Sequence, residues 1–225
     1  YRLWKREANP KARVAKMLRR FRAFEKTGLT EQECLLRLLE TRRRWKNLAP
    51  RFLRELVSRL GSKEDLFRFV SVSEEYDYLR EHYPALATKT DLEESMIEVA
   101  CLFAEFGHRL QGEGRLKEAE FVQKLALRLQ PYQYFTTLPL AATYHEMGRD
   151  ADALPLFEKG LAHFNSWREN SASADSSFSP AKCLGPGTEI GKLQKYYKKM
   201  YAQCRKALES SSASICIFVF AELLC

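Results

Sequence analysis

Histidine and cysteine are the side chains of this chain best suited to bind a metal or act as a nucleophile, and they are scattered. They are His82, His108, His145, His163, Cys34, Cys101, Cys183, Cys204, Cys216 and Cys225. No CxxC pair occurs, and a zinc site in a protein uses three or four protein ligands. His108 and His145 offer only a pair, so we expect neither a metal site nor a cofactor.

Cys101 and His108 form the nucleophile-and-base pair that a single helix would bring nearest. They are two helical turns apart, which is too far for the direct hydrogen bond that activates a thiol. A glycine-rich phosphate loop is also missing, since Gly112 and Gly114 fit a turn between helices. We therefore predict no catalytic residues and a protein that is not an enzyme.

Arginine and aromatic side chains are interleaved near the amino terminus in a pattern that suits nucleic acid. The candidate contacts are Arg19, Arg20, Arg22, Arg42, Arg43, Arg44 and Trp45. Guanidinium groups pair with phosphates, and aromatic rings stack on bases. Phe21 and Phe24 belong to an apolar helix stripe and are expected in a core, which leaves Trp45 as the stacking candidate.

Positive charge is concentrated in the same region. The net charge of the chain is +8, yet residues 1–60 contain 18 Lys and Arg against 6 Asp and Glu, so the remainder is slightly acidic. This distribution favours an acidic partner for the basic front: RNA or another nucleic acid, an anionic membrane surface or a protein. A basic helix face that contacts only solvent is the other interpretation.

The elements that position these residues are predicted to be helices. Apolar residues recur at three- and four-residue steps in segments 10–26, 34–42, 52–60 and 62–83, without the alternation typical of strands. Gly28 fits the end of the first helix, and Thr30 with Glu33 forms a capping-box sequence for the second. Residues 1–89 are therefore predicted to form a basic helical region.

The last third of the chain contains a linker, a helix and an apolar tail. Residues 166–187 are rich in Ser, Ala, Gly and Pro, as flexible linkers are. A stripe over residues 190–208 predicts a helix with lysines on its outer face. Serines at positions 210–212 are expected to end this helix, and the apolar stretch 215–224 is too short to cross a membrane.

Two segments in the middle of the chain match at a spacing of 34 residues. The sequence GRLKEA from Gly114 to Ala119 is echoed by GRDADA from Gly148 to Ala153. Each glycine fits a helix-to-helix turn, where a left-handed backbone is cheap only for glycine. Each alanine fits a close crossing of two helices. The spacing therefore predicts two successive helix hairpins.

This pattern resembles the tetratricopeptide repeat (TPR) family, whose unit is a 34-residue helix hairpin. The units are placed at residues 100–133 and 134–167. The matching structural positions are Gly107, Gly114, Ala119, Pro131, Gly148, Ala153 and Phe157. Gln123, Thr137 and Asn165 depart from the family pattern, and Pro139 and Pro155 fall at or near helix interiors, where a kink is expected.

The resemblance also implies a concave groove, lined by the first helix of each unit, that binds a partner peptide. Its facing residues would be Cys101, Ala104, His108, Phe135, Leu138, Ala142 and His145. Relatives that hold the carboxylate of a chaperone use Lys, Asn and Arg in this groove, and those residues are replaced here. An apolar or helical partner segment is therefore favoured. The alternative is that the chain itself covers Phe135 and Leu138.

Together these features predict an all-α protein with a short TPR-like solenoid. Its parts are a basic helical region (1–89), repeats (90–167), a linker (168–188), a covering helix (189–209) and an apolar tail (210–225). The predicted function is that of an adaptor or scaffold for a partner protein, with RNA binding or membrane-surface association as alternatives. Scattered cysteines are typical of reduced thiols, which favours cytoplasm or nucleus. The basic amphipathic front leaves a mitochondrial origin open.

Overall fold

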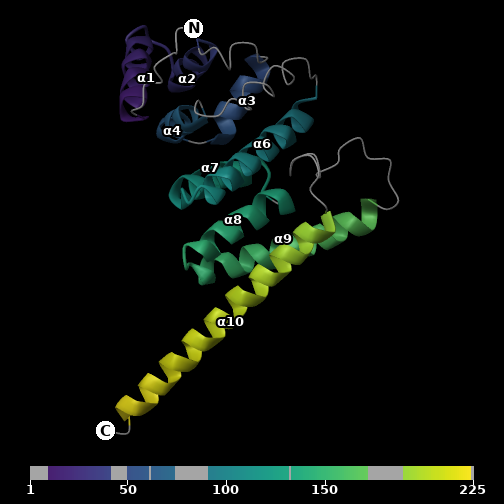
Figure 1. Ribbon diagram of the computed structural model, residues 1–225. Helices are drawn as coiled ribbons and strands as arrows, with labels where there is room; N and C mark the ends of the chain where they lie inside the picture. The colour runs from purple at the N-terminus through teal and green to yellow at the C-terminus, as the bar shows by residue number, and fades with distance from the viewer. Residues whose placement is uncertain are drawn as a thin grey trace, which may run out of the picture. The chain divides into compact units, whose positions relative to one another are not determined.

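The computed structural model describes residues 10–41, 50–60, 62–73, 91–131, 133–171 and 190–223 (Figure 1). Helices and short turns make up these ranges, and none of the described residues belongs to a strand. The predicted all-α class is confirmed. The chain divides into two compact units, Tyr1–Met96 and Ile97–Cys225, so the division falls inside a helix rather than at residue 90.

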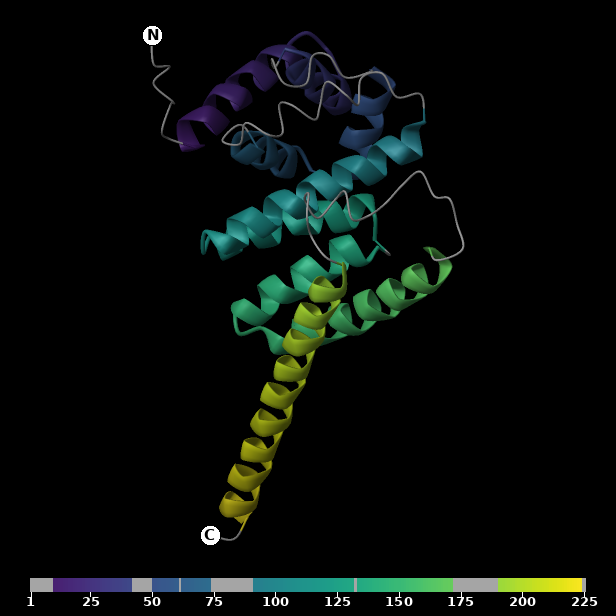
Figure 2. The ribbon, with the colours of Figure 1, turned by 45° about the vertical axis from the view of Figure 1, so that its right-hand side comes forward.

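Four helices of unit 1 surround a core that contains aromatic side chains. They are α1 (Pro10–Glu25), α2 (Glu31–Glu40), α3 (Pro50–Leu60) and α4 (Lys63–Ser73). α1 packs against α2 and α4, and α2 packs against α3 (Figure 2). The rings of Phe21 and Phe67 meet edge to face, with centroids 5.4 Å apart. The apolar stripe predicted for residues 10–26 therefore faces this core.

Reciprocal hydrogen bonds between Thr30 and Glu33 fix the start of α2. Thr30 N–H donates to Glu33 Oε2 at 2.8 Å, and Glu33 N–H donates to Thr30 Oγ1 at 3.4 Å. They satisfy two of the amides that the first turn of a helix leaves unpaired. Hydrogen bonds from the Thr30 hydroxyl and amide stabilise the carboxylate and so lower the pKa of Glu33. The predicted capping box is confirmed.

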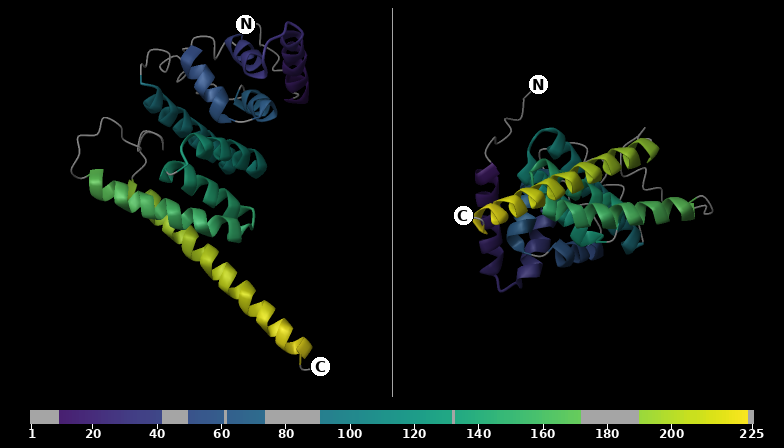
Figure 3. Two further views of the ribbon diagram at one scale, coloured as in Figure 1. Left: turned by 180° about the vertical axis from the view of Figure 1, so that it is seen from behind. Right: turned by 90° about the horizontal axis from the view of Figure 1, so that it is seen from below.

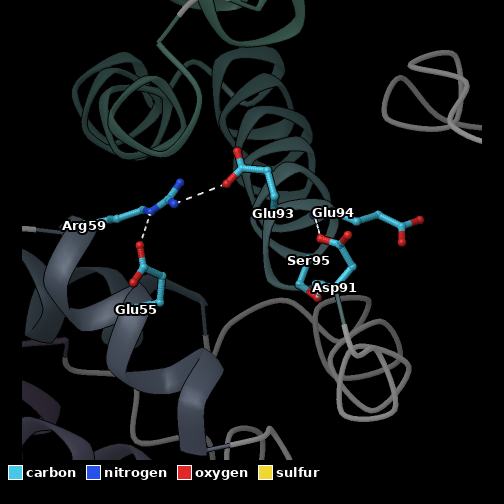
Figure 4. A network of polar contacts seen from close by, with 6 residues as sticks. All are labelled: Glu55, Arg59, Asp91, Glu93, Glu94 and Ser95. Atoms are coloured by element: carbon cyan, nitrogen blue, oxygen red, sulfur yellow. Dashed lines mark hydrogen bonds and ion pairs between the residues drawn. The ribbon is translucent and has the colours of Figure 1, made fainter.

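Arg59 links α3 to the first turn of α6 (Leu92–Gly112) through two carboxylates. Its guanidinium lies 2.6 Å from Glu55 Oε1 in α3 and 3.3 Å from Glu93 Oε2 in α6 (Figure 4). Hydrogen bonding to Glu55 is the main reason that the pKa of Arg59 is raised. The ion pairs tie the start of α6 to unit 1.

Asp91 immediately precedes α6 and caps it. Its side-chain Oδ1 accepts a hydrogen bond from Glu94 N–H at 2.9 Å, and its carbonyl accepts one from the Ser95 hydroxyl at 2.7 Å (Figure 4). Asp is a favoured residue at this position because its carboxylate replaces a missing intrahelical acceptor. The helix thus begins near the start of the region 90–167 that the sequence assigns to the repeats.

Unit 2 contains the remainder of α6 and the helices that follow it in the described residues. They are α7 (Leu116–Leu129), α8 (Tyr134–Glu146), α9 (Asp150–Ser171) and α10 (Ile190–Leu223). α8 packs against both α7 and α9, and α10 runs along α9 and past it (Figure 3). α6 and α7 form one hairpin, and α8 and α9 form the second.

The two hairpins turn in the same way. Gly114 and Gly148 have φ values of +73° and +71°, the left-handed conformation that favours glycine. Gly114 N–H donates to Gln111 O, and Gly148 N–H donates to His145 O, both at 2.9 Å. Because these pairs are 34 residues apart, the predicted spacing of the two turns is confirmed.

The repetition extends to side chains after each turn. Arg115 pairs with Glu118 at 2.5 Å, and Arg149 pairs with Asp152 at 2.7 Å. In both hairpins the arginine precedes the second helix and the carboxylate lies in its first turn. The carboxylate also complements the positive end of the helix dipole.

Glycines allow the helices of each hairpin to approach closely. A Cβ at Gly107 would lie 2.4 Å from Gln123 Cγ, and one at Gly160 would lie 2.6 Å from Leu138 Cδ2. Other predicted repeat positions are buried, namely Ala119, Ala153 and Phe157. Pro131 follows the end of α7, as predicted.

α10 covers the second hairpin, as the stripe over residues 190–208 predicts. Gln194 Nε2 donates to Asn165 Oδ1 in α9 at 2.6 Å. The sequence predicts that this helix ends at the serines that begin with Ser210. This prediction is wrong, since the helix continues to Leu223. Serine lowers helix propensity only moderately, and neither Gly nor Pro follows Gly191.

Candidate functional site

Most residues predicted to line a partner groove lie in the interior. The buried ones are Cys101, Ala104, Phe135, Leu138 and Ala142. His108 is exposed, and His145 is half-buried. The structure therefore does not place an open groove at Phe135 and Leu138. The burial of Phe135 and Leu138 agrees with the other hypothesis from the sequence, that the chain itself covers these two side chains.

The composition of α8 explains this burial. Each residue from Tyr134 to Tyr144 is buried, and none of them is charged. A helix that is apolar all round belongs in an interior. The hydroxyls of Thr136 and Thr137 donate to the Gln133 carbonyl at 2.8 and 3.0 Å, which satisfies them without solvent.

The two prolines lie inside helices that continue beyond them. α8 runs through Pro139, and α9 runs through Pro155 to Ser171. Neither residue therefore ends its helix. α9 includes residues 168–171, which the sequence assigns to the linker, and residues 172–189 lie outside the described part of the chain.

Three arginines predicted to contact nucleic acid are exposed on α1. Arg19, Arg20 and Arg22 face solvent, whereas Met17 and Phe21 are buried. No side-chain hydrogen bond or ion pair engages these three guanidinium groups within the described residues. They are therefore available to bind phosphate or carboxylate groups. Outside the described residues lie Arg42, Arg43, Arg44 and Trp45.

A second basic surface lies on the first part of α10, and we refer to it as the α10 basic face. Its exposed cations are Lys192, Lys195, Lys198, Lys199, Arg205 and Lys206. Tyr196 lies among them and is 40% exposed. Tyr197 and Met200 are buried on the other side of the helix. This surface combines charge with an aromatic ring.

A cluster not predicted from the sequence lies where α10 passes the turn between α8 and α9. His145 Nδ1 is 2.5 Å from Asp150 Oδ1, and Cys204 Sγ donates a hydrogen bond to the Asp150 carbonyl at 3.2 Å. One ligand atom from each of the three side chains lies within 4.8 Å of the others. The His145 and Asp150 side chains are 21% and 17% exposed, whereas Cys204 is fully buried.

The Cys204 thiol of this cluster has a raised pKa. Burial raises the pKa of Cys204 to about 12, and the charge of Asp150 contributes in the same direction. Sequence spacing could have indicated the pair His145 and Asp150, which flank the Gly148 turn. It could not indicate Cys204, because the path of the chain between α9 and α10 determines which turn α10 passes.

Gln123 is a departure from the family pattern that the structure makes visible. Its side chain is fully buried against Gly107, and neither of its amide atoms has a hydrogen-bond partner. The position 34 residues later holds Phe157, which is buried and apolar. An amide at this place is energetically unfavourable.

The sequence led us to expect that the cysteines are reduced, but this does not hold for all of them. Cys34 and Cys204 are free, whereas Cys101 is disulfide-bonded. The expectation of reduced thiols is therefore wrong at Cys101. Among the described residues, no helix is long and apolar enough to cross a membrane.

Comparison with known proteins gives no relative: no protein-family model, curated protein or solved structure matches the chain. The features of the chain that bear on function are the hairpins, the two basic surfaces and the cluster of His145, Asp150 and Cys204.

Proposed function

We propose that this chain is a non-enzymatic scaffold of the tetratricopeptide type that binds an acidic partner protein. The observation that carries the proposal is the repetition of a helix hairpin at 34 residues, with the same glycine turn and the same arginine–carboxylate pair. Stacked hairpins of this kind provide extended surfaces for binding.

The α10 basic face is the proposed contact. Its lysines attract an acidic segment, and Tyr196 offers an aromatic ring of the type enriched at protein interfaces. A groove around Phe135 and Leu138 is not part of the proposal, because both side chains are buried. The partner is therefore expected to be acidic rather than apolar.

Charge reversal on α10 tests the proposal. Full-length chain carrying Lys195→Glu, Lys198→Glu and Lys199→Glu is compared with wild type in chemical crosslinking followed by mass spectrometry. The matched control carries Lys16→Glu, Arg19→Glu and Arg20→Glu, the same change in charge on exposed residues of α1. We expect a crosslinked partner with an acidic segment that is lost with the α10 variant and kept with the control. If the α10 variant retains all partners of the wild type, the proposed contact is wrong.

RNA binding through α1 is the second candidate function, and the three exposed, unpaired guanidinium groups of Arg19, Arg20 and Arg22 favour it. Each phosphate contact contributes to the salt dependence of binding. Replacement of the three arginines with alanine is therefore expected to weaken RNA binding and to flatten its dependence on salt. Binding that is equal in this variant would exclude α1 as the site. Loss of binding to anionic vesicles, but not to RNA, would favour the membrane-surface alternative.

The proposed compartment is the cytoplasm or nucleus, with mitochondria as the alternative. Free thiols at Cys34 and Cys204 support a reducing environment, whereas the disulfide at Cys101 counts against it, since disulfides are rare in the cytosol. Alkylation of free thiols in intact cells, followed by mass spectrometry of the Cys101 peptide, measures whether Cys101 is reduced. A reduced Cys101 supports a reducing compartment, and an oxidised Cys101 counts against one.

A further inference from the structure

Three side chains of the types that bind zinc meet at one place in unit 2, although they come from three helices. His145 is near the end of α8, Asp150 begins α9, and Cys204 lies in α10. We propose that His145, Asp150 and Cys204 bind a zinc ion that fastens α10 to the turn between α8 and α9. Imidazole, carboxylate and thiolate are the three protein ligand types that zinc uses.

The spacing of the ligand atoms is close to what zinc requires. Zinc–ligand bonds of about 2.0–2.3 Å in a tetrahedron place neighbouring ligand atoms roughly 3.3–3.8 Å apart. His145 Nδ1 and Asp150 Oδ1 lie 2.5 Å apart, and one ligand atom from each of the three side chains lies within 4.8 Å of the others. Zinc binding through these two atoms therefore requires the imidazole and the carboxylate to move apart by about 1 Å.

The first hairpin provides an internal comparison for the second. It makes the same turn at Gly114, but its residues equivalent to His145 and Asp150 are Gln111 and Leu116. The turn therefore requires neither an imidazole nor a carboxylate at these two positions. At the second turn both positions hold side chains of zinc-ligand types, and a cysteine of α10 reaches that turn. A metal site explains why His145, Asp150 and Cys204 meet at this turn. The backbone conformation of the turn alone does not explain it.

Exposure of the cluster allows an ion to enter from solvent. Cys204 forms the buried end, whereas the side chains of His145 and Asp150 are partly exposed. On binding, the hydrogen bond between His145 and Asp150 and the one from the Cys204 thiol to the Asp150 carbonyl are broken. The thiol loses its proton to solvent and the Sγ–Zn bond forms. The fourth position of the tetrahedron then faces solvent and takes a water molecule. Two ligands come from the turn and one from α10, so the ion joins the second hairpin to its covering helix.

Cobalt titration of the metal-free full chain tests the site, because Co²⁺ replaces Zn²⁺ and reports a bound thiolate by absorption. We expect one Co²⁺ per chain, with a thiolate-to-cobalt charge-transfer band that Zn²⁺ abolishes by displacement. The Cys204→Ser variant should lack this band. The matched control is Cys34→Ser, which removes the other buried free thiol and should keep the band.

The half-exposed ligands provide a test that does not depend on replacing a buried residue. His145→Gln and Asp150→Asn should each weaken Co²⁺ binding at least tenfold while circular dichroism remains that of the wild type. One equivalent of Zn²⁺ should raise the melting temperature of the wild type but not that of His145→Gln. Absence of a charge-transfer band in the wild type, a band that persists in Cys204→Ser, or equal Co²⁺ affinity in both other variants would overturn the proposal.

Discussion

At the scale of single residues, Gln123 combines full burial with two unpaired amide atoms. Burying a polar group without a partner costs free energy, so an apolar residue is expected to be more favourable at this position. The neighbouring Gly107 leaves room for the Gln123 side chain, since a Cβ at Gly107 would overlap Gln123 Cγ. Leucine also has a Cγ at this place and carries no polar atoms.

Gln123→Leu is therefore expected to stabilise the protein by about 1–3 kcal/mol. Urea denaturation followed by circular dichroism measures this change. The matched control is Gln194→Leu, which removes the hydrogen bond from Gln194 to Asn165 and should not stabilise. A Gln123→Leu variant that is less stable than the wild type would show that Gln123 has a partner or role not visible in the structure.

Thr30 and Glu33 illustrate a residue pair whose structure could be predicted from the sequence alone. Thr30→Ala removes the hydroxyl oxygen that accepts a hydrogen bond from the Glu33 backbone N–H. We therefore expect the free energy of unfolding to fall by about 1 kcal/mol. Thr30→Ser retains the hydroxyl and should lie within a few tenths of a kcal/mol of the wild type. Chemical denaturation at neutral pH measures both variants, and equal stability of Thr30→Ala and wild type would contradict the capping role.

The same pair predicts a pH dependence. The pKa of Glu33 is lowered in the folded state, so its stabilising effect is complete above the unfolded pKa and is lost as pH falls through the folded pKa. The stability difference between the wild type and Glu33→Gln should therefore shrink when denaturation is repeated at pH values below 4.5, the ordinary pKa of this group. A difference that is independent of pH would mean that the carboxylate is not the acceptor.

At the scale of elements, the two hairpins are alike because their turns require the same backbone conformation. Gly114 and Gly148 have almost the same left-handed φ, and no atom within 4 Å restricts a Cβ at either position. A substitution at these glycines therefore changes backbone strain and little else.

Gly114→Ala and Gly148→Ala are each expected to destabilise the protein by about 1–2 kcal/mol, and by similar amounts. Gly112→Ala is the control, since this residue lies at the end of α6 without a left-handed φ or a close contact. Differential scanning calorimetry measures all three. A large effect at one glycine and none at the other would show that the turns are not equivalent.

Element prediction succeeded where local signals suffice and failed where packing decides. The stripe of α1, the capping box of α2 and the glycine turns depend on residues within a few positions of each other. The groove prediction failed because it assumed that α8 has an open face, whereas Phe135 and Leu138 are enclosed. The predicted end of α10 at the serines is wrong, because serine lowers helix propensity only moderately and does not end a helix by itself.

At the scale of the whole molecule, positive charge occurs on the surface of both units. α1 of unit 1 exposes Arg19, Arg20 and Arg22, and α10 of unit 2 exposes the α10 basic face. The sequence predicted the first surface from the density of arginine in residues 1–60. The second surface is less evident from the sequence, because residues 61–225 as a whole are slightly acidic although α10 carries lysines.

The His145, Asp150 and Cys204 cluster marks the limit of sequence reasoning for the site. Its first two members are five residues apart, whereas Cys204 is 54 residues from Asp150. Contacts over that separation depend on how α10 packs against the second hairpin. Without a matching relative, only the folded chain could bring them together.

The measurement that tests the central claim most directly is the Kd between the full chain and the acidic partner identified by crosslinking, determined by isothermal titration calorimetry. If the α10 basic face is the contact, Lys195→Glu, Lys198→Glu and Lys199→Glu together should raise the Kd at least tenfold, about 1.4 kcal/mol, while the α1 control leaves it unchanged. An unchanged Kd in the α10 variant, with its helical circular dichroism intact, would contradict the proposal that α10 of this chain binds an acidic protein.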